Sequence, residues 1–124
     1  MADGTGRAGR SGESAELRRL RRRIDLLDRR IVTLLNERAS IARDAGRAKT
    51  AAGRTAIRDA EREREILLRV SMANEGPLPQ AHLLAMYRRL FAATRELERR
   101  DRDLDRAGGG NVAPGDGGDG GGRS

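Results

Sequence analysis

One arginine interrupts an apolar stripe in the first half of the sequence. Apolar residues recur three and four positions apart, from Leu17 through Ile24 to Leu34, as on one face of a helix. The next position on this stripe is Arg38, and a continuation of the stripe reaches a second cation at Lys49. A guanidinium group stays protonated in proteins, so an arginine on an inward face requires an anionic partner. The two cations therefore indicate a site for a small anion.

The spacing of these cations limits what they could bind. Arg38 and Lys49 are eleven residues apart, so both leave one helix face, about 16 Å apart along the axis. Long side chains at that spacing could hold one small dianion between them. Arg21 also faces inward, but it precedes Arg38 by seventeen residues, or about 25 Å along a straight helix. In an antiparallel dimer Arg21 could reach the site of the partner chain, which would give two shared sites.

Three charged residues at the start of the second predicted helix follow Lys49 closely in the sequence. Asp59, Arg62 and Glu63 come directly after the loop around Gly53, near enough to line a pocket with Lys49. Asp59 is also a candidate N-cap, because its carboxylate can accept a hydrogen bond from a free amide of the first helical turn.

Two polar residues stand at the end of another apolar stripe, on the third predicted helix. Thr94 and Glu98 are one turn apart and point the same way, after Tyr87 and Phe91, which are interpreted as core. Many other arginines are interpreted as solvated faces or surface ion pairs. This interpretation covers Arg22, Arg23, Arg29, Arg30, Arg64, Arg88, Arg99 and Arg100.

The composition favours long helices and excludes several kinds of chemistry. The chain has 124 residues, of which 36% are hydrophobic and 36% charged, with one Phe, one Tyr and no Trp. So few aromatic residues do not suit a sheet-based core. The sequence has no cysteine, and His82 is its single histidine, so disulfides, thiolate catalysis and zinc-thiolate or clustered-histidine sites are excluded. We expect neither a metal nor a cofactor.

The predicted fold is all-α, with helices in the order long, short, long. The expected helices span residues 15–50, 60–73 and 79–106. The first would be about 50 Å long, too long to pack only against its own chain, so we expect an intertwined helical homodimer.

The two ends of the chain differ from its centre in composition. The Gly-rich segments 1–14 and 107–124 are expected to be disordered tails, which leaves one domain over 15–106. Segment 1–14 lacks the apolar region of a signal peptide, and no stretch is long enough to span a membrane. We therefore expect a cytoplasmic protein.

Five segments carry a more specific pattern. They are LRRRIDLLD (20–28), LLNER (34–38), AGRAK (45–49), IRDAERE (57–63) and YRRLFAATRELE (87–98). In their order and spacing, over nearly all of 17–98, they resemble the all-helical, AroQ-type chorismate mutases. The segments 74–79 and 87–98 look most like the version fused to, or associated with, DAHP synthase.

The resemblance implies roles for the residues that match the motifs of the family. Arg38 would pair with one carboxylate of the substrate, and Arg21 of the other subunit with a carboxylate of the same ligand. Lys49 would donate to the ether oxygen and to a carboxylate. Glu98 stands where the family often has Gln, and Thr94 where it often has Ser.

The resemblance implies further contacts at the second helix. Glu63 would accept a hydrogen bond from the ring hydroxyl of the substrate, with Asp59 beside it near the pocket loop. Arg62 would lie at the pocket rim or bind a carboxylate.

The implied reaction is the rearrangement of chorismate, a dianion, to prephenate. It needs no nucleophile, metal or redox cofactor, but the site must hold the substrate in a chair-like shape and stabilise charge on the breaking ether oxygen. A glutamate can donate a hydrogen bond to that oxygen only when it is protonated. We therefore expect activity to fall as rising pH removes the Glu98 proton, and Glu98→Gln to flatten this dependence.

Other functions stay open on the sequence alone. An isochorismate-pyruvate lyase and a mutase of 4-amino-4-deoxychorismate share the implied fold, and a regulatory subunit that docks on DAHP synthase is a further alternative. A net charge of +7 also suits a basic helical module that binds nucleic acid, but such a module does not explain Arg38 on an apolar stripe. We therefore expect chorismate and a second copy of the chain as partners, a DAHP synthase as a further candidate partner, and neither nucleic acid nor a membrane.

Overall fold

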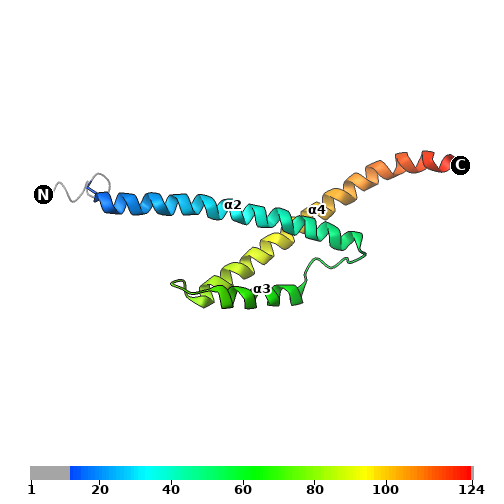
Figure 1. The fold of residues 1–124 in the computed structure, drawn as a ribbon. Helices are drawn as coiled ribbons and strands as arrows, with labels where there is room; N and C mark the ends of the chain where they lie inside the picture. Colours follow the sequence, from blue (N-terminus) through cyan, green and yellow to red (C-terminus); the bar gives the residue numbers. More distant parts are fainter. Residues whose placement is uncertain (1–11, 124) are drawn as a thin grey trace. The chain divides into compact units, whose positions relative to one another are not determined.

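All regular structure in the described part of the chain is helical. The computed structural model describes the backbone of residues 12–123 and the side chains of residues 12–108. Three helices follow one another in this part of the chain, without a strand (Figure 1). They are α2 (Ala15–Ala51), α3 (Ala60–Ala73) and α4 (Gln80–Arg123). The prediction of an all-α fold with a long, a short and a long helix is confirmed.

The chain divides into two compact units, residues 1–40 and residues 41–124. The first unit contains most of α2, and the second contains the end of α2 together with α3 and α4. Arg21 and Arg38 belong to the first unit, whereas the other predicted site residues belong to the second.

The helices begin where short polar side chains cap them. The Ser14 hydroxyl accepts a hydrogen bond from the Leu17 backbone N–H at 3.0 Å, which starts α2. The Asp59 carboxylate accepts one from the Arg62 backbone N–H at 3.0 Å, which starts α3 at the predicted position. Asn74 ends α3, and its own backbone N–H donates to the Val70 carbonyl.

A left-handed glycine ends α2 directly after the turn that carries Lys49. Gly53 has φ of 86°, a conformation that costs glycine little. Its N–H donates to the Thr50 carbonyl at 2.9 Å, and the Arg54 N–H donates to the Lys49 carbonyl at 2.9 Å. These two bonds form a Schellman motif, which satisfies carbonyls at the helix end and turns the chain toward α3.

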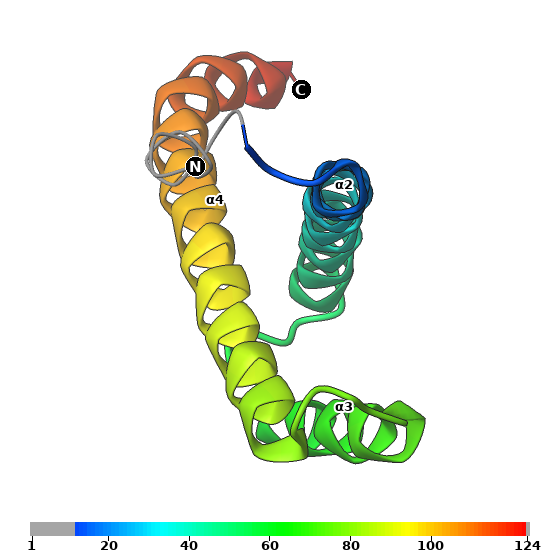
Figure 2. The same cartoon turned by 90° about the vertical axis from the view of Figure 1, so that its left-hand side faces the viewer.

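The helices α3 and α4 contact each other at an angle and carry the small core of this unit (Figure 1). Figure 2 shows the 74–79 loop turning the chain from α3 into α4. Phe91 is the only buried apolar side chain among the described residues, with 5% of its surface exposed. Its ring meets that of Tyr87 edge to face, with centroids 6.2 Å apart. The interpretation of both residues as core is consistent with this contact.

The apolar stripe of α2 is exposed in the single chain. Ile24, Ile31 and Leu34 each keep half or more of their surface in water. The described part of the single chain therefore leaves uncovered the stripe that the spacing predicts to face inward.

The C-terminal end of α4 extends past residue 106, where the predicted domain ends. Gly108 and Pro114 lie in this extension, and in a helix interior glycine costs about 1 kcal/mol and proline about 3 kcal/mol relative to alanine. The disorder expected over 107–124 stays a prediction. The N-terminal tail predicted over 1–14 falls mostly on residues 1–11, which lie outside the described residues. None of the helices in the described region is long and apolar enough to cross a membrane.

Candidate active site

Two predicted cations lie on the part of α2 within residues 1–40. Arg21 is exposed and pairs with Glu13, just before the helix. Arg38 is partly buried. Because α2 is uninterrupted between them, these positions are about 25 Å apart along the helix axis. The two guanidinium groups of one chain therefore cannot hold the same small ligand.

Lys49 and Asp59 lie near the two ends of the loop that joins α2 to α3. The carboxylate of Asp59 is 3.5 Å from the Arg54 guanidinium. The pKa of Asp59 is lowered, chiefly by the hydrogen bond from the Arg62 N–H; burial opposes the shift, and attraction to Arg54 and Lys49 adds to it. Asp59 is therefore an ionised group already engaged by its own helix, and it puts a negative charge near Lys49.

The other two predicted residues of α3 have different surroundings. The Arg62 guanidinium lies 2.9 Å from the Glu65 carboxylate on the exposed side of α3. Glu63 is mostly buried, and its carboxylate contacts Arg95 of α4 and Arg58 of the preceding loop. The structure thus brings Glu63 into the groove between α3 and α4, and it leaves Arg62 on the surface.

Thr94 and Glu98 lie one turn apart on α4, as the spacing predicts. The Thr94 hydroxyl donates to the Leu90 carbonyl at 3.0 Å, so its proton is engaged within the helix. Glu98 lies against Gly46 of α2, where an added Cβ atom would be 3.3 Å from a carboxylate oxygen. A glycine at this position lets Glu98 approach α2 one turn before Lys49.

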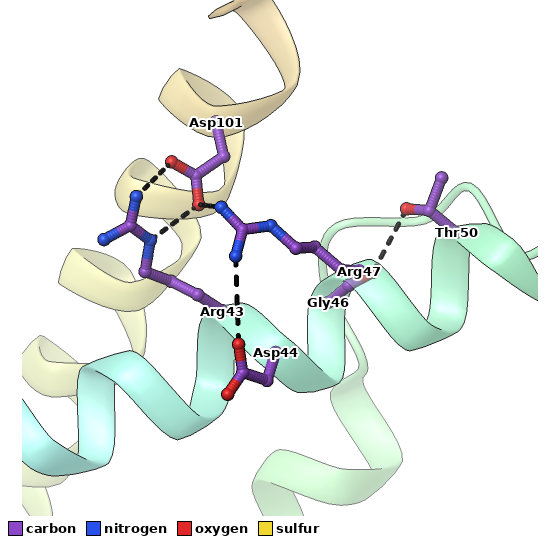
Figure 3. A network of polar contacts seen from close by, with 6 residues as sticks. All are labelled: Arg43, Asp44, Gly46, Arg47, Thr50 and Asp101. Carbon is purple, nitrogen blue, oxygen red and sulfur yellow. Dashed lines mark hydrogen bonds and ion pairs between the residues drawn. The ribbon is translucent and has the colours of Figure 1, made fainter. Parts of the chain in front are cut away.

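A cavity of about 540 Å³ opens beside Glu98, between the end of α2 and α4. At its wall, Asp101 accepts two hydrogen bonds from Arg43, from Nε at 2.8 Å and from Nη2 at 2.9 Å (Figure 3). Arg47 approaches Asp101 at 4.0 Å and Asp44 at 3.8 Å. A bidentate contact of this kind is stronger and more directional than a single ion pair, so it fastens the end of α2 to α4.

The sequence pattern did not identify Asp101 as a site residue, although the spacing of the charged residues around it could have indicated this. Asp101 follows Glu98 by three residues and so shares its face of α4. Arg43 and Arg47 are four residues apart on α2, which lets both approach the same carboxylate. The sequence does not show that this face of α2 lies against this face of α4.

We expect Asp101→Asn to lower stability at neutral pH and to leave it nearly unchanged in acid. The hydrogen bond from Arg43 is the main cause that lowers the pKa of Asp101 below its ordinary value of 3.8. A lowered pKa stabilises the fold above that ordinary value, and the contribution is lost as pH falls through the folded-state pKa. Thermal unfolding at about pH 6 and about pH 3 measures this difference. An equal gap between wild type and variant at both pH values would contradict the prediction.

The groups around the cavity and the loop suit the binding of an anion. Lys49 and the arginines supply fixed positive charge, and Glu98, when protonated, supplies a hydrogen bond. No group of three or more His, Cys, Asp or Glu within the described side chains is arranged to hold a metal ion. Such a site can bind a dianion and stabilise negative charge that develops on an oxygen atom.

Similar proteins point to the same chemistry. A chorismate mutase from Thermus thermophilus, in its form II structure, superposes with a TM-score of 0.65 at 32% identity, over 68% of this chain and 96% of that one. The form I structure of the enzyme gives a TM-score of 0.61 at 30% identity, over 64% of this chain and 98% of that one.

Two curated relatives are bifunctional chorismate mutase/prephenate dehydratases. The protein of Aquifex aeolicus is 39% identical over 83 residues, and that of Neisseria gonorrhoeae is 37% identical over 76 residues. The matched regions cover 64% and 61% of this chain but 23% and 20% of those proteins, so the chain spans about a quarter of their length or less. The activity joined to the mutase in these relatives is a dehydratase, not the DAHP synthase that the sequence pattern suggested.

The model of the family described as "Chorismate mutase type II" matches residues 20–99. This region runs from the first turns of α2 into α4 and includes every predicted site residue. The chain therefore belongs to the type II chorismate mutase family.

Proposed function

We propose that this chain converts chorismate to prephenate by electrostatic stabilisation of a bound dianion. The observation that carries the proposal is the approach of Glu98 to Gly46, one turn from Lys49. A carboxyl group from α4, when it carries a proton, and a cation from α2 can then act on one oxygen atom. That is the arrangement needed where an ether bond breaks and negative charge collects on its oxygen.

The proposed division of roles follows from the charges. Lys49 and Glu98 donate to the ether oxygen, and Lys49 also meets a carboxylate. Arg38 pairs with a substrate carboxylate, because a guanidinium binds a carboxylate through two parallel hydrogen bonds. Glu63 accepts from the ring hydroxyl, supported by its place in the groove between α3 and α4.

The remaining predicted residues have supporting roles in the proposal. Asp59 caps α3 and holds negative charge near Lys49, which keeps the loop ordered at the site. Thr94 supplies a hydroxyl on the face of Glu98. Arg62 lies at the rim and can bind a carboxylate after leaving Glu65.

We also propose that two copies of the chain form an intertwined dimer with two shared sites. Two observations support it: the exposed apolar stripe of α2, and the distance of about 25 Å between Arg21 and Arg38 on one helix. In an antiparallel pair the Arg21 of one chain completes the carboxylate clamp of the other. In a twofold-symmetric dimer the same surface of each chain meets its copy, so the stripe of one chain can cover the stripe of the other.

Mixing two inactive variants tests the shared site. Arg21→Ala and Arg38→Ala should each abolish most activity, and unfolding and refolding them together should restore about a quarter of it. Random pairing makes half the dimers mixed, and each mixed dimer has one intact site out of two. Turnover of chorismate by the refolded mixture is the measurement. A mixture as inactive as its components would contradict the shared site.

Product analysis tests the proposed reaction against others on the same fold. The protein is incubated with chorismate, with isochorismate and with 4-amino-4-deoxychorismate, and the products are separated and identified. Prephenate formed from chorismate as the preferred reaction supports the proposal. Pyruvate release from isochorismate, or preference for the amino compound, would replace it with a lyase or an aminodeoxychorismate mutase.

Association with a DAHP synthase remains a narrower proposal. It rests on the resemblance of segments 74–79 and 87–98 to the version of the family that works with that enzyme. Turnover of chorismate measured with and without an added DAHP synthase tests it. A rate that does not change, with no complex on gel filtration, would remove it.

A further inference from the structure

The carboxylate of Glu63 is held between two arginines of different elements. Arg95 of α4 donates from Nη1 to one carboxylate oxygen, and Arg58 of the loop lies 3.3 Å from the other. The two arginines differ in exposure: 22% of the Arg95 side chain is exposed to solvent, against 65% of the Arg58 side chain. The Glu63 side chain between them is 15% exposed. The Glu63–Arg95 pair is therefore a half-buried bridge between α3 and α4, with Arg58 closing it from the solvent side.

This bridge borders a cavity of about 230 Å³ between α3 and α4. Phe91, the one buried side chain among those described, lines the same cavity and gives it an apolar wall. Screening by water is weak beside such a surface, so the pair is more rigid than an ion pair on an exposed helix face.

A carboxylate so held still has capacity for one more hydrogen bond. Two carboxylate oxygens offer about four lone-pair sites, and the two arginines occupy only part of them. Because Arg58 and Arg95 face its two oxygens, the carboxylate is fixed in place and can accept a further hydrogen bond. The partner that suits it is a donor, such as a hydroxyl group.

We infer that Arg95 is a positioning residue for the substrate, acting through Glu63. The inference rests on the proposed function, in which Glu63 accepts from the ring hydroxyl of chorismate. A free glutamate must order its side-chain torsions when substrate binds, whereas the bridge orders them beforehand. Arg95 also offsets the repulsion between the Glu63 carboxylate and a substrate that carries two negative charges.

The effect of removing Arg95 should fall on binding more than on the chemical step. The ring hydroxyl is bound in the ground state and in the transition state alike, so losing its partner raises KM and changes kcat less. Misplacing a binding group by about 1 Å can cost on the order of a hundredfold, so Arg95→Met should lower kcat/KM by roughly tenfold to a hundredfold. Arg95→Lys, which keeps a cation, should recover most of this loss.

A double-mutant cycle on kcat/KM for chorismate separates positioning from a general structural role. The four proteins are wild type, Arg95→Met, Glu63→Gln and the double variant, with Arg99→Met as an unchanged surface control. In the Glu63→Gln background, Arg95→Met should cost less than about threefold, because the charge through which Arg95 acts is already gone. If Arg95→Met does not give a helical, folded protein, Arg95→Gln replaces it in the cycle with the same expectation.

The outcomes separate this inference from the proposed function. An equal loss from the Arg95 substitution in both backgrounds, in an active wild type, would overturn the positioning role and leave the proposed function intact. A wild type without chorismate turnover would overturn both. A loss confined to the background that retains Glu63, and seen mainly in KM, supports the inference.

Discussion

Lys49→Ala should lower kcat/KM for chorismate by roughly a hundredfold to a thousandfold at neutral pH. That is the usual effect of removing one preorganised donor from a site where negative charge develops. Lys49 is partly buried, close to Asp59 and one turn from the Gly46 position that Glu98 approaches. In such partly dehydrated surroundings a fixed charge acts more strongly than in water. The loss of chorismate absorbance with time gives the rate.

A matched control separates loss of charge at the site from loss of charge in general. Arg99 of α4 is exposed and pairs with Glu96 of the same helix, so Arg99→Ala should stay within twofold of wild type. Helix content and thermal unfolding show whether Lys49→Ala still folds, since Lys49 also attracts Asp59. A folded Lys49→Ala variant with more than a third of wild-type activity would contradict the role of this cation.

Glu98→Gln should raise activity at alkaline pH and flatten its pH dependence. A glutamine amide donates a hydrogen bond at every pH, whereas the glutamate donates only while it carries a proton. Six other charged groups line the cavity with Glu98: Arg43 and Arg47 from α2, and Asp101, Arg102, Asp105 and Arg106 from α4. The substitution removes one negative charge from this group and keeps the side-chain shape.

The pH–rate profiles of both proteins test this expectation. At about pH 9 the kcat/KM of the variant should exceed that of wild type by on the order of a hundredfold. This is the usual effect on rate of one hydrogen-bond donor at an oxygen atom that gains negative charge. At the acid end of the profiles the two rates should approach each other. A wild-type kcat/KM that is flat from acid to alkaline pH would show that the proton of Glu98 takes no part.

Local signals in the sequence were sufficient to predict most helix boundaries. Asp59 and Asn74 bracket α3 at the predicted residues, because a carboxylate cap and the turn that follows are encoded by neighbours in the chain. The end of α2 follows from Gly53, whose conformation few other residues adopt easily. The order and type of the helices could therefore be predicted from short-range chemistry.

The contacts between helices could not be predicted in the same way. In the sequence Arg95 and Asp101 look like Arg99 and Asp103. These last two residues form ion pairs within α4 on its exposed side, Arg99 with Glu96 and Asp103 with Arg106. Only the packing of α3, and of the end of α2, against α4 decides which of them meet Glu63 or Arg43. Helical spacing orders the residues of one face, but it does not state which face of another helix lies opposite.

The apolar stripe of α2 shows a second limit of local patterns. Its spacing predicts an inward face, yet in the single chain Ile24 and Leu34 are more than half exposed. A helical face can be buried only by a surface that another element supplies, and the stripe alone does not say whether that element belongs to the same chain. Arg21 adds that information, because its distance from Arg38 requires a second copy under the proposed function.

The most direct test of the proposed function is chorismate turnover by wild type and by Arg38→Ala, measured side by side. Arg38 is the cation that interrupts the apolar stripe, and the proposal makes it one half of the carboxylate clamp. Wild type should form prephenate, and Arg38→Ala should retain its helix content but lose at least about a hundredfold in kcat/KM. Absence of turnover in wild type, or equal turnover in a folded Arg38→Ala variant, would contradict the account.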